Sequence, residues 1–192
     1  MAQLPSRPQL ENGANGIAYR AEQLAGIASL VLPRATFQGD PRDVTTISNA
    51  LVESALVNAR ALGWFFTRTS DINMAMFAPN WTDDVVAIAG EIVTPVSRHL
   101  GHATTGDNAG EPHPGLWPIT ELAVVLTGGL ARFVDALDPN SATYDRAWFT
   151  PSPRDTYGEL MKLDVLAVRT LRSANPSVRE LTVALQQFVD TH

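Results

Sequence analysis

The chain has 192 residues, of which 45% are hydrophobic and 18% are charged, and its formal net charge is −6 at pH 7. These values fit a globular protein and exclude an intrinsically disordered chain. The acidic balance argues against broad nucleic-acid binding, which needs clustered positive charge, so no DNA partner is expected. Because the sequence has no cysteine, it offers neither a disulfide nor a thiolate zinc site.

Residues 1–14 carry few large apolar side chains, which predicts a flexible or draped arm. No apolar run follows Arg7, so we expect no signal peptide. The Gly-Ala-Asn-Gly sequence at 13–16 is interpreted as a turn, and the first helix is predicted from about Asn15 to Leu32, where Pro33 ends it. The remaining residues, 15–192, are predicted to form a single helical domain.

The second predicted helix runs from about Asp43 to Arg68, with apolar residues at helical spacing along one face. A second stripe lies on the opposite face and consists of Glu53, Val57, Arg60 and Trp64. A purely solvated face would not normally carry Val and Trp. We therefore expect this stripe to contact a neighbouring helix or a partner subunit.

The third predicted helix extends from Asp83 to about His102, with Thr82 as its N-cap. Pro95 lies inside it and should kink the helix or split it in two, because proline removes a backbone donor. A loop rich in glycine and proline is expected at 104–118.

The fourth predicted helix spans about Ile119 to Leu137, and its charged residues and glycines indicate a buried helix rather than a membrane span. The glycine pair 128–129 requires another helix to pack closely there. Aromatic residues in the connector 138–154 indicate that it is held against the domain, and helices are predicted at 156–173 and 176–190. The predicted fold is an all-α bundle of about five to six helices, with a long packed connector before the last two.

Three of the four histidines lie within fifteen residues, and two of them belong to the sequence Arg-His-Leu-Gly-His at 98–102. At 100° per residue, His99 falls about 60° from the centre of the apolar face. Glu91, Arg98 and His102 fall together on the polar side. We therefore interpret His99 as structural, and Glu91, Arg98 and His102 as the candidate functional residues.

Several interpretations of this sequence stay open. His99 could bond to another helix while Arg98 and His102 balance the negative helix C-terminus. Arg98 and His102, with Glu91, could instead form a metal-independent ribonuclease site. His99 and His102 could bind a metal together with Glu53, Glu91, Asp107 or His113, although no Glu-x-x-His pair occurs. The polar face could also recognise a partner protein.

Asn58 occupies the edge of the core face on the second helix, as His99 does on the third. If these two helices are antiparallel neighbours, Asn58 and His99 should share a hydrogen bond. Both are therefore predicted to be structural polar residues.

Residues 49–66 (NALVESALVNARALGWFF), Trp81 and residues 96–104 (VSRHLGHAT) resemble a loose group of small bacterial all-helical proteins that carries no established activity. This resemblance covers roughly residues 45–137. More distantly, the arrangement is similar to HEPN-type helical bundles, many of which are ribonucleases of toxin or phage-defence systems. That similarity implies roles in RNA cleavage for Arg98 and His102, which here have three residues between them.

Taken together, these patterns predict a cytoplasmic interaction or regulatory protein, non-catalytic and without a cofactor. It is expected to form a homodimer and to have a protein partner, with Glu53, Arg60 and Trp64 as interface residues. No membrane association is expected, and RNA is a partner only under the ribonuclease alternative.

Overall fold

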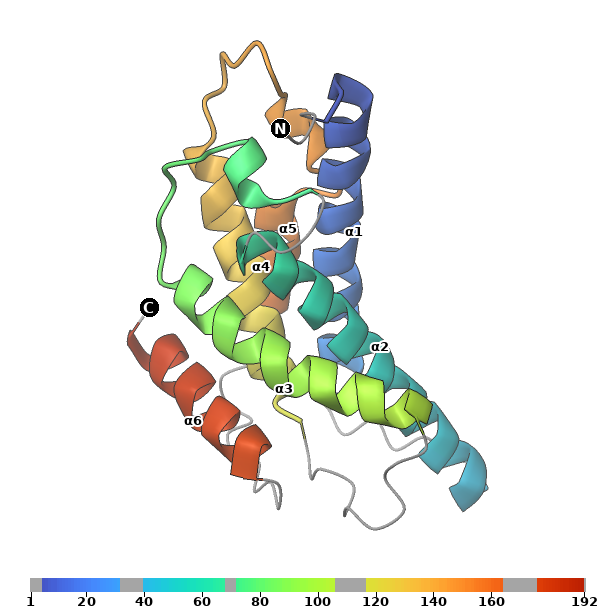
Figure 1. Ribbon diagram of the computed structural model, residues 1–192. Helices are drawn as coiled ribbons and strands as arrows, with labels where there is room; N and C mark the ends of the chain where they lie inside the picture. The colour runs from blue at the N-terminus through green and yellow to red at the C-terminus, as the bar shows by residue number, and fades with distance from the viewer. Residues whose placement is uncertain (1–4, 32–39, 68–71, 106–116, 164–175, 192) are drawn as a thin grey trace.

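The computed structural model describes residues 5–31, 40–67, 72–105, 117–163 and 176–191, without the side chains of Val31 and of residues 101–105. Throughout these ranges the regular structure is entirely helical, with no strand, so the predicted all-α bundle is confirmed. The helices, shown in Figure 1, are α1 (Arg7–Val31), α2 (Pro41–Thr67), η1 (Met74–Met76), α3 (Val85–Thr105), α4 (Ile119–Ala136), η2 (Arg146–Trp148), α5 (Pro153–Lys162) and α6 (Pro176–Thr191).

Helix α4 is the centre of the bundle. Every residue from Ile119 to Ala131 is buried, including the polar Thr120, Glu121 and Thr127. All five of the other described α-helices pack against it. A helix that is apolar on every side must be surrounded on every side. Its position therefore follows from its composition.

Two glycines allow close packing against α4, as predicted. A Cβ atom on Gly129 would lie 2.5 Å from Cγ2 of Val85, the first residue of α3. A Cβ atom on Gly128 would lie 2.9 Å from Cε2 of Tyr157 in α5. The glycines thus make room for side chains from two different helices, which offsets their low helix propensity.

The prediction of an N-terminal arm is wrong for the described residues from Arg7 onward, because α1 begins there. The backbone N–H and the hydroxyl of Ser6 both donate to Gln9 Oε1, at 2.7 and 2.9 Å, which closes half of a capping box. Leu10 and Ala14 are buried, so these first turns contribute to the core. The predicted turn at 13–16 is also helical.

The first turns of α2 differ from the prediction in another way. Val44 and Ile47 are among the apolar residues whose helical spacing predicts a buried face of this helix, yet Ile47 is 44% exposed and Val44 only half-buried. In Figure 1 this end of α2 projects past the neighbouring helices. The core face becomes buried only from Ala55 onward, where α1, α3 and α4 surround the helix.

The connector 138–154 is packed against the bundle, as its aromatic residues predicted. Tyr144, Trp148 and Phe149 are buried. The rings of Tyr144 and Phe149 meet the Phe77 ring edge-on, with centroids 5.8 and 5.4 Å apart. Together with η1 and η2, these rings close one end of the core.

Candidate functional site: a groove between α3 and α6

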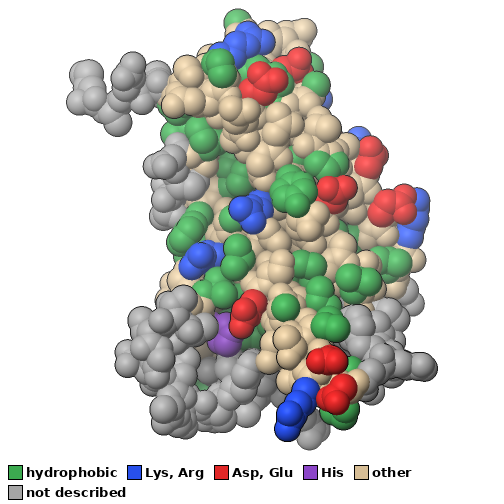
Figure 2. All heavy atoms as spheres, turned by 90° about the vertical axis from the view of Figure 1, so that its right-hand side faces the viewer, with side chains coloured by type: hydrophobic (Ala, Val, Ile, Leu, Met, Phe, Trp, Pro, Cys, Tyr) green, Lys and Arg blue, Asp and Glu red, His purple; other side chains and the backbone are tan. Residues whose placement is uncertain are grey.

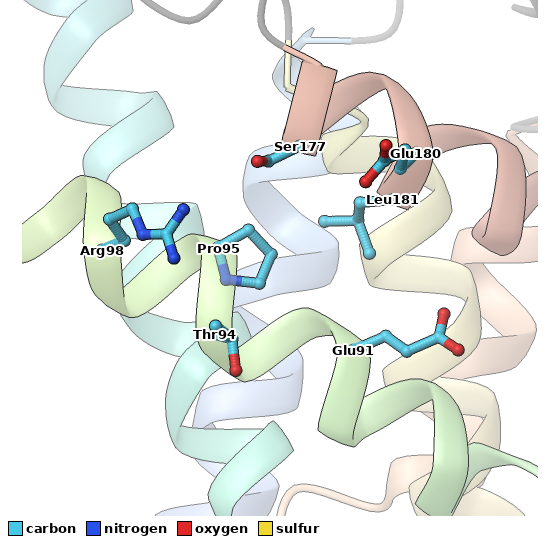
Figure 3. Close-up of a pocket in the computed structure, with 7 residues that line it drawn as sticks. All are labelled: Glu91, Thr94, Pro95, Arg98, Ser177, Glu180 and Leu181. Atoms are coloured by element: carbon cyan, nitrogen blue, oxygen red, sulfur yellow. The ribbon is translucent and has the colours of Figure 1, made fainter.

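A groove of about 360 Å³ lies between α3 and the first turns of α6. Figure 3 shows how the side chains from the two helices face one another across it. Its apolar floor is formed by Pro95 and Leu181, and its rim is polar. The residues that line it are Glu91, Thr94, Pro95, Arg98, Ser177, Glu180 and Leu181. We call it the α3–α6 groove.

Pro95 does not split α3, which runs without interruption from Val85 to Thr105. Of the two outcomes predicted for Pro95, a kink or a split, the split does not occur. Proline has no N–H, so the Glu91 carbonyl, four residues earlier, loses its usual helical donor. Both residues line the α3–α6 groove.

The charges in the α3–α6 groove are separated along its length. Arg98 and Ser177 lie at one end, near the N-terminus of α6, where the helix dipole favours an anion. Glu91 and Glu180 lie toward the other end. Since Glu91 and Arg98 are seven residues apart on one helix, their Cα atoms are separated by about 10 Å. The groove therefore presents one site for an anion and another for a cation.

These charged groups are available for binding. Glu91, Arg98 and Glu180 are exposed. Within the described part of the chain none of the three forms an ion pair or a side-chain hydrogen bond, whereas Asp83–Arg132, Asp135–Arg154 and Glu159–Lys162 do pair. The sequence pattern correctly placed Glu91 and Arg98 on one polar face, and the structure adds α6 opposite them.

Ser177 and Glu180 are groove residues that sequence reasoning missed. They are about eighty residues away from Glu91 and Arg98 along the chain. Only the packing of α6 against α3 brings the two pairs together. The polar face of the last helix was visible in the sequence, but no local pattern indicates which helix it faces.

Of the two histidines in the 98–102 sequence, the structure describes the side chain of His99 only. The half-buried His99 ring lies against Trp117, with ring centroids 5.3 Å apart and an interplanar angle of 60°, and does not line the α3–α6 groove. His102 belongs to α3, but its side chain lies outside the described residues, as do Asp107 and His113. The predicted partnership of His102 with Arg98 and Glu91 is therefore still a prediction.

Asn58 does not bond to His99, so the predicted pairing is wrong. Its Oδ1 accepts a 3.0 Å hydrogen bond from Arg20 Nη1 of α1, and its Nδ2 donates to the Ser54 carbonyl at 2.9 Å. The side chain is only 3% exposed, so these bonds satisfy a buried amide. Asn58 thus faces α1, whereas Gly63, further along α2, packs closely against Val93 of α3.

The predicted stripe of Glu53, Val57, Arg60 and Trp64 lies on the outer side of α2 and apart from the α3–α6 groove; we call it the α2 stripe. Glu53 is exposed and Val57 is 37% exposed. The Arg60 guanidinium lies 4.7 Å from the centre of the Trp64 ring, a cation–π contact. Arg60 and Trp64 are half-buried, and none of the four side chains belongs to the hydrophobic core. A contact of this stripe with a partner subunit is therefore still a prediction.

Charge on the rest of the surface is mixed. Figure 2 shows acidic and basic side chains interspersed over one face of the molecule, with hydrophobic side chains between them. Among the described residues, no group of three or more His, Asp or Glu side chains lies close enough to hold a metal ion. None of the described helices has the length and apolar character needed to cross a membrane.

Comparison with known proteins gives no match: no family model fits the chain, and neither the curated proteins nor the solved structures include a significant relative.

Proposed function

We propose that this protein is a non-catalytic interaction protein of the bacterial cytoplasm that binds a short segment of a partner protein in the α3–α6 groove. The observation that carries the proposal is the set of three exposed charged side chains, Glu91, Arg98 and Glu180, arranged around an apolar floor and without partners among the described residues. Unpaired charges of both signs at a concave site favour a ligand that carries both.

The shape of the groove favours a protein segment over a small metabolite. Small-molecule sites usually enclose most of their ligand, whereas Glu91, Thr94, Arg98 and Glu180 are all exposed here and only Leu181 is fully buried. An extended chain advances about 3.3 Å per residue. A separation of about 10 Å between Glu91 and Arg98 therefore suits a basic and an acidic residue some three positions apart. An aliphatic side chain between them would contact Pro95 and Leu181.

The ribonuclease alternative ranks second. One observation favours it, because the Arg98 guanidinium is exposed in the groove, where a phosphate could reach it. However, Glu91 and Glu180 line the same groove and would repel a phosphodiester backbone. The metal-binding alternative has no supporting group of ligands among the described residues.

Selection of a random displayed peptide library against the full chain tests the proposal. We expect enriched peptides with a basic and an acidic residue two to four positions apart and an aliphatic residue between them. Glu180→Lys and Arg98→Glu should each weaken the binding of an enriched peptide by about tenfold or more. The matched control is Glu22→Lys on α1, which packs against α2, α4 and α5 and should leave binding unchanged. Peptides that show no such pattern, or that bind both groove variants normally, would contradict the proposal.

A second experiment separates the alternatives. The protein is incubated with a panel of small RNAs without added metal, beside Arg98→Ala and His102→Ala. We expect no cleavage by any of the three. Cleavage by the wild type that disappears in both variants would establish the ribonuclease instead. Elemental analysis of the purified protein would reveal a stoichiometric metal if the third interpretation were correct.

A further inference from the structure

The α2 stripe has the composition of a protein interface rather than of a solvated helix face. Tryptophan and arginine are enriched in interfaces, and here they stack on one another beside the exposed Val57. Within the described residues Glu53 forms no ion pair or side-chain hydrogen bond, and neither does Arg60, whose guanidinium lies over the Trp64 ring. The stripe thus offers an apolar centre between an unpaired anion and an unpaired cation.

The order of these residues along α2 is self-complementary. Glu53 and Arg60 are seven residues, or two turns, apart, so both point to the same side of the helix. Val57 lies between them. If a second α2 runs antiparallel across the first, with a two-fold axis close to Val57, Glu53 of each copy faces Arg60 of the other. An isologous interface of this kind forms every contact twice.

From this arrangement we infer that the occupant of the α2 stripe is a second copy of the same chain, paired antiparallel through α2 in a two-fold dimer. The dimer contains two Glu53–Arg60 ion pairs on either side of a centre formed by Val57, and a Trp64 ring lies beyond each pair. This inference does not depend on the α3–α6 groove, because the stripe and the groove share no residue.

Charge complementarity favours a second copy over an unrelated partner. A partner with a uniformly acidic or basic surface would match only one end of the stripe and would face a like charge at the other. The chain itself supplies the opposite charge at each end. At a net charge of −6, two copies repel each other overall, so specific local ion pairs are needed to align them.

The test combines charge reversals with sedimentation velocity on the full chain. The wild type should be a dimer. Glu53→Arg and Arg60→Glu should each raise the dissociation constant by about tenfold or more, because each places like charges together at both ends. The double variant E53R/R60E should recover dimerisation, since both pairs are restored in reversed order. An equimolar mixture of the two single variants should form a heterodimer, although neither dimerises well alone.

Matched controls lie on α5, which packs against α1 and α4. Glu159→Arg and Lys162→Glu make the same charge changes at exposed positions and should leave the dimer intact. Circular dichroism should show unchanged helicity for every variant, because the altered stripe positions lie outside the core. A monomeric wild type, or a dimer that tolerates both single reversals, would overturn the inference. So would weakened single variants that neither the double variant nor the mixture rescues.

Discussion

Asp83 holds the beginning of α3 against the last turns of α4 through a two-point bond to Arg132. Arg132 Nε lies 2.7 Å from Asp83 Oδ2, and Nη2 lies 2.8 Å from Oδ1. The same Oδ1 accepts the Val85 backbone N–H at 2.9 Å, so Asp83 also caps α3, the role predicted for Thr82. One carboxylate therefore satisfies a helix terminus and joins two helices.

Loss of this carboxylate should be costly. We expect Asp83→Ala to lower the free energy of unfolding by about 2–3 kcal/mol, because it removes a cap and a bidentate pair together. Arg132→Gln should cost less, about 1 kcal/mol, since the cap remains. Urea denaturation measures both. Glu159→Gln breaks the exposed pair with Lys162 and should cost under about 0.5 kcal/mol. Equal losses at all three positions would contradict this ranking.

The contribution of Arg132 should not vary with pH across the usable range. Its hydrogen bonds to Asp83 raise the pKa of Arg132 above the ordinary arginine value, while burial acts in the opposite direction. A cationic group whose pKa is higher in the folded state than in the unfolded state stabilises the fold at every pH below its unfolded-state pKa. This stabilisation disappears only as the pH rises through the folded-state pKa. The stability difference between wild type and Arg132→Gln should therefore be equal at about pH 6 and about pH 9. A marked fall toward the higher pH would show that another group controls it.

Alanine substitutions at Gly129 and Gly158 should change the stability of the fold in opposite directions. Gly129→Ala should destabilise by about 1–3 kcal/mol, because its new Cβ would overlap the stiff β-branched side chain of Val85. Gly158→Ala in α5 meets no atom within 4 Å and should stabilise by about 0.5–1 kcal/mol. Thermal denaturation of the two variants provides the comparison. A stabilising Gly129→Ala would mean that the contact between α3 and α4 yields easily.

The hydrogen bond between Arg20 and Asn58 should matter more to one partner than to the other. Asn58→Ala should cost about 1–3 kcal/mol, because it removes a buried amide and leaves a small cavity. Arg20→Ala should cost less, about 1 kcal/mol, since Arg20 is exposed and the Asn58 amide still donates to Ser54. Chemical denaturation distinguishes the two. A greater loss at Arg20 would indicate that its aliphatic stem contributes more than its hydrogen bond.

Helical periodicity predicted α2 and α4 to within a few residues at each end, because long amphipathic or apolar patterns dominate local preference. The start of α1 was missed because its first turns lack such a long apolar pattern. Its first turns bury small side chains such as Ala14 beside Gly13 and Gly16, which locally resemble a turn. The signal that could have located it was the pairing of Ser6 with Gln9.

The candidate site was predictable only on one of its two walls. Glu91 and Arg98 share a face of α3, and helix geometry alone places them together. Glu180 faces them because α6 packs on α3, and no spacing within the sequence encodes that contact. Asn58 shows the same limit, since its position at the edge of a core face could not reveal whether α1 or α3 would be its neighbour.

The central position of α4 also has a consequence for how this protein unfolds. Each of the other described α-helices rests on α4, so removing any one of them exposes part of its apolar surface to water. Detachment of a peripheral helix therefore also destabilises the central helix α4. We expect the amide protons of α4 to exchange with solvent only through global unfolding, whereas those in the projecting first turns of α2 exchange through local fraying.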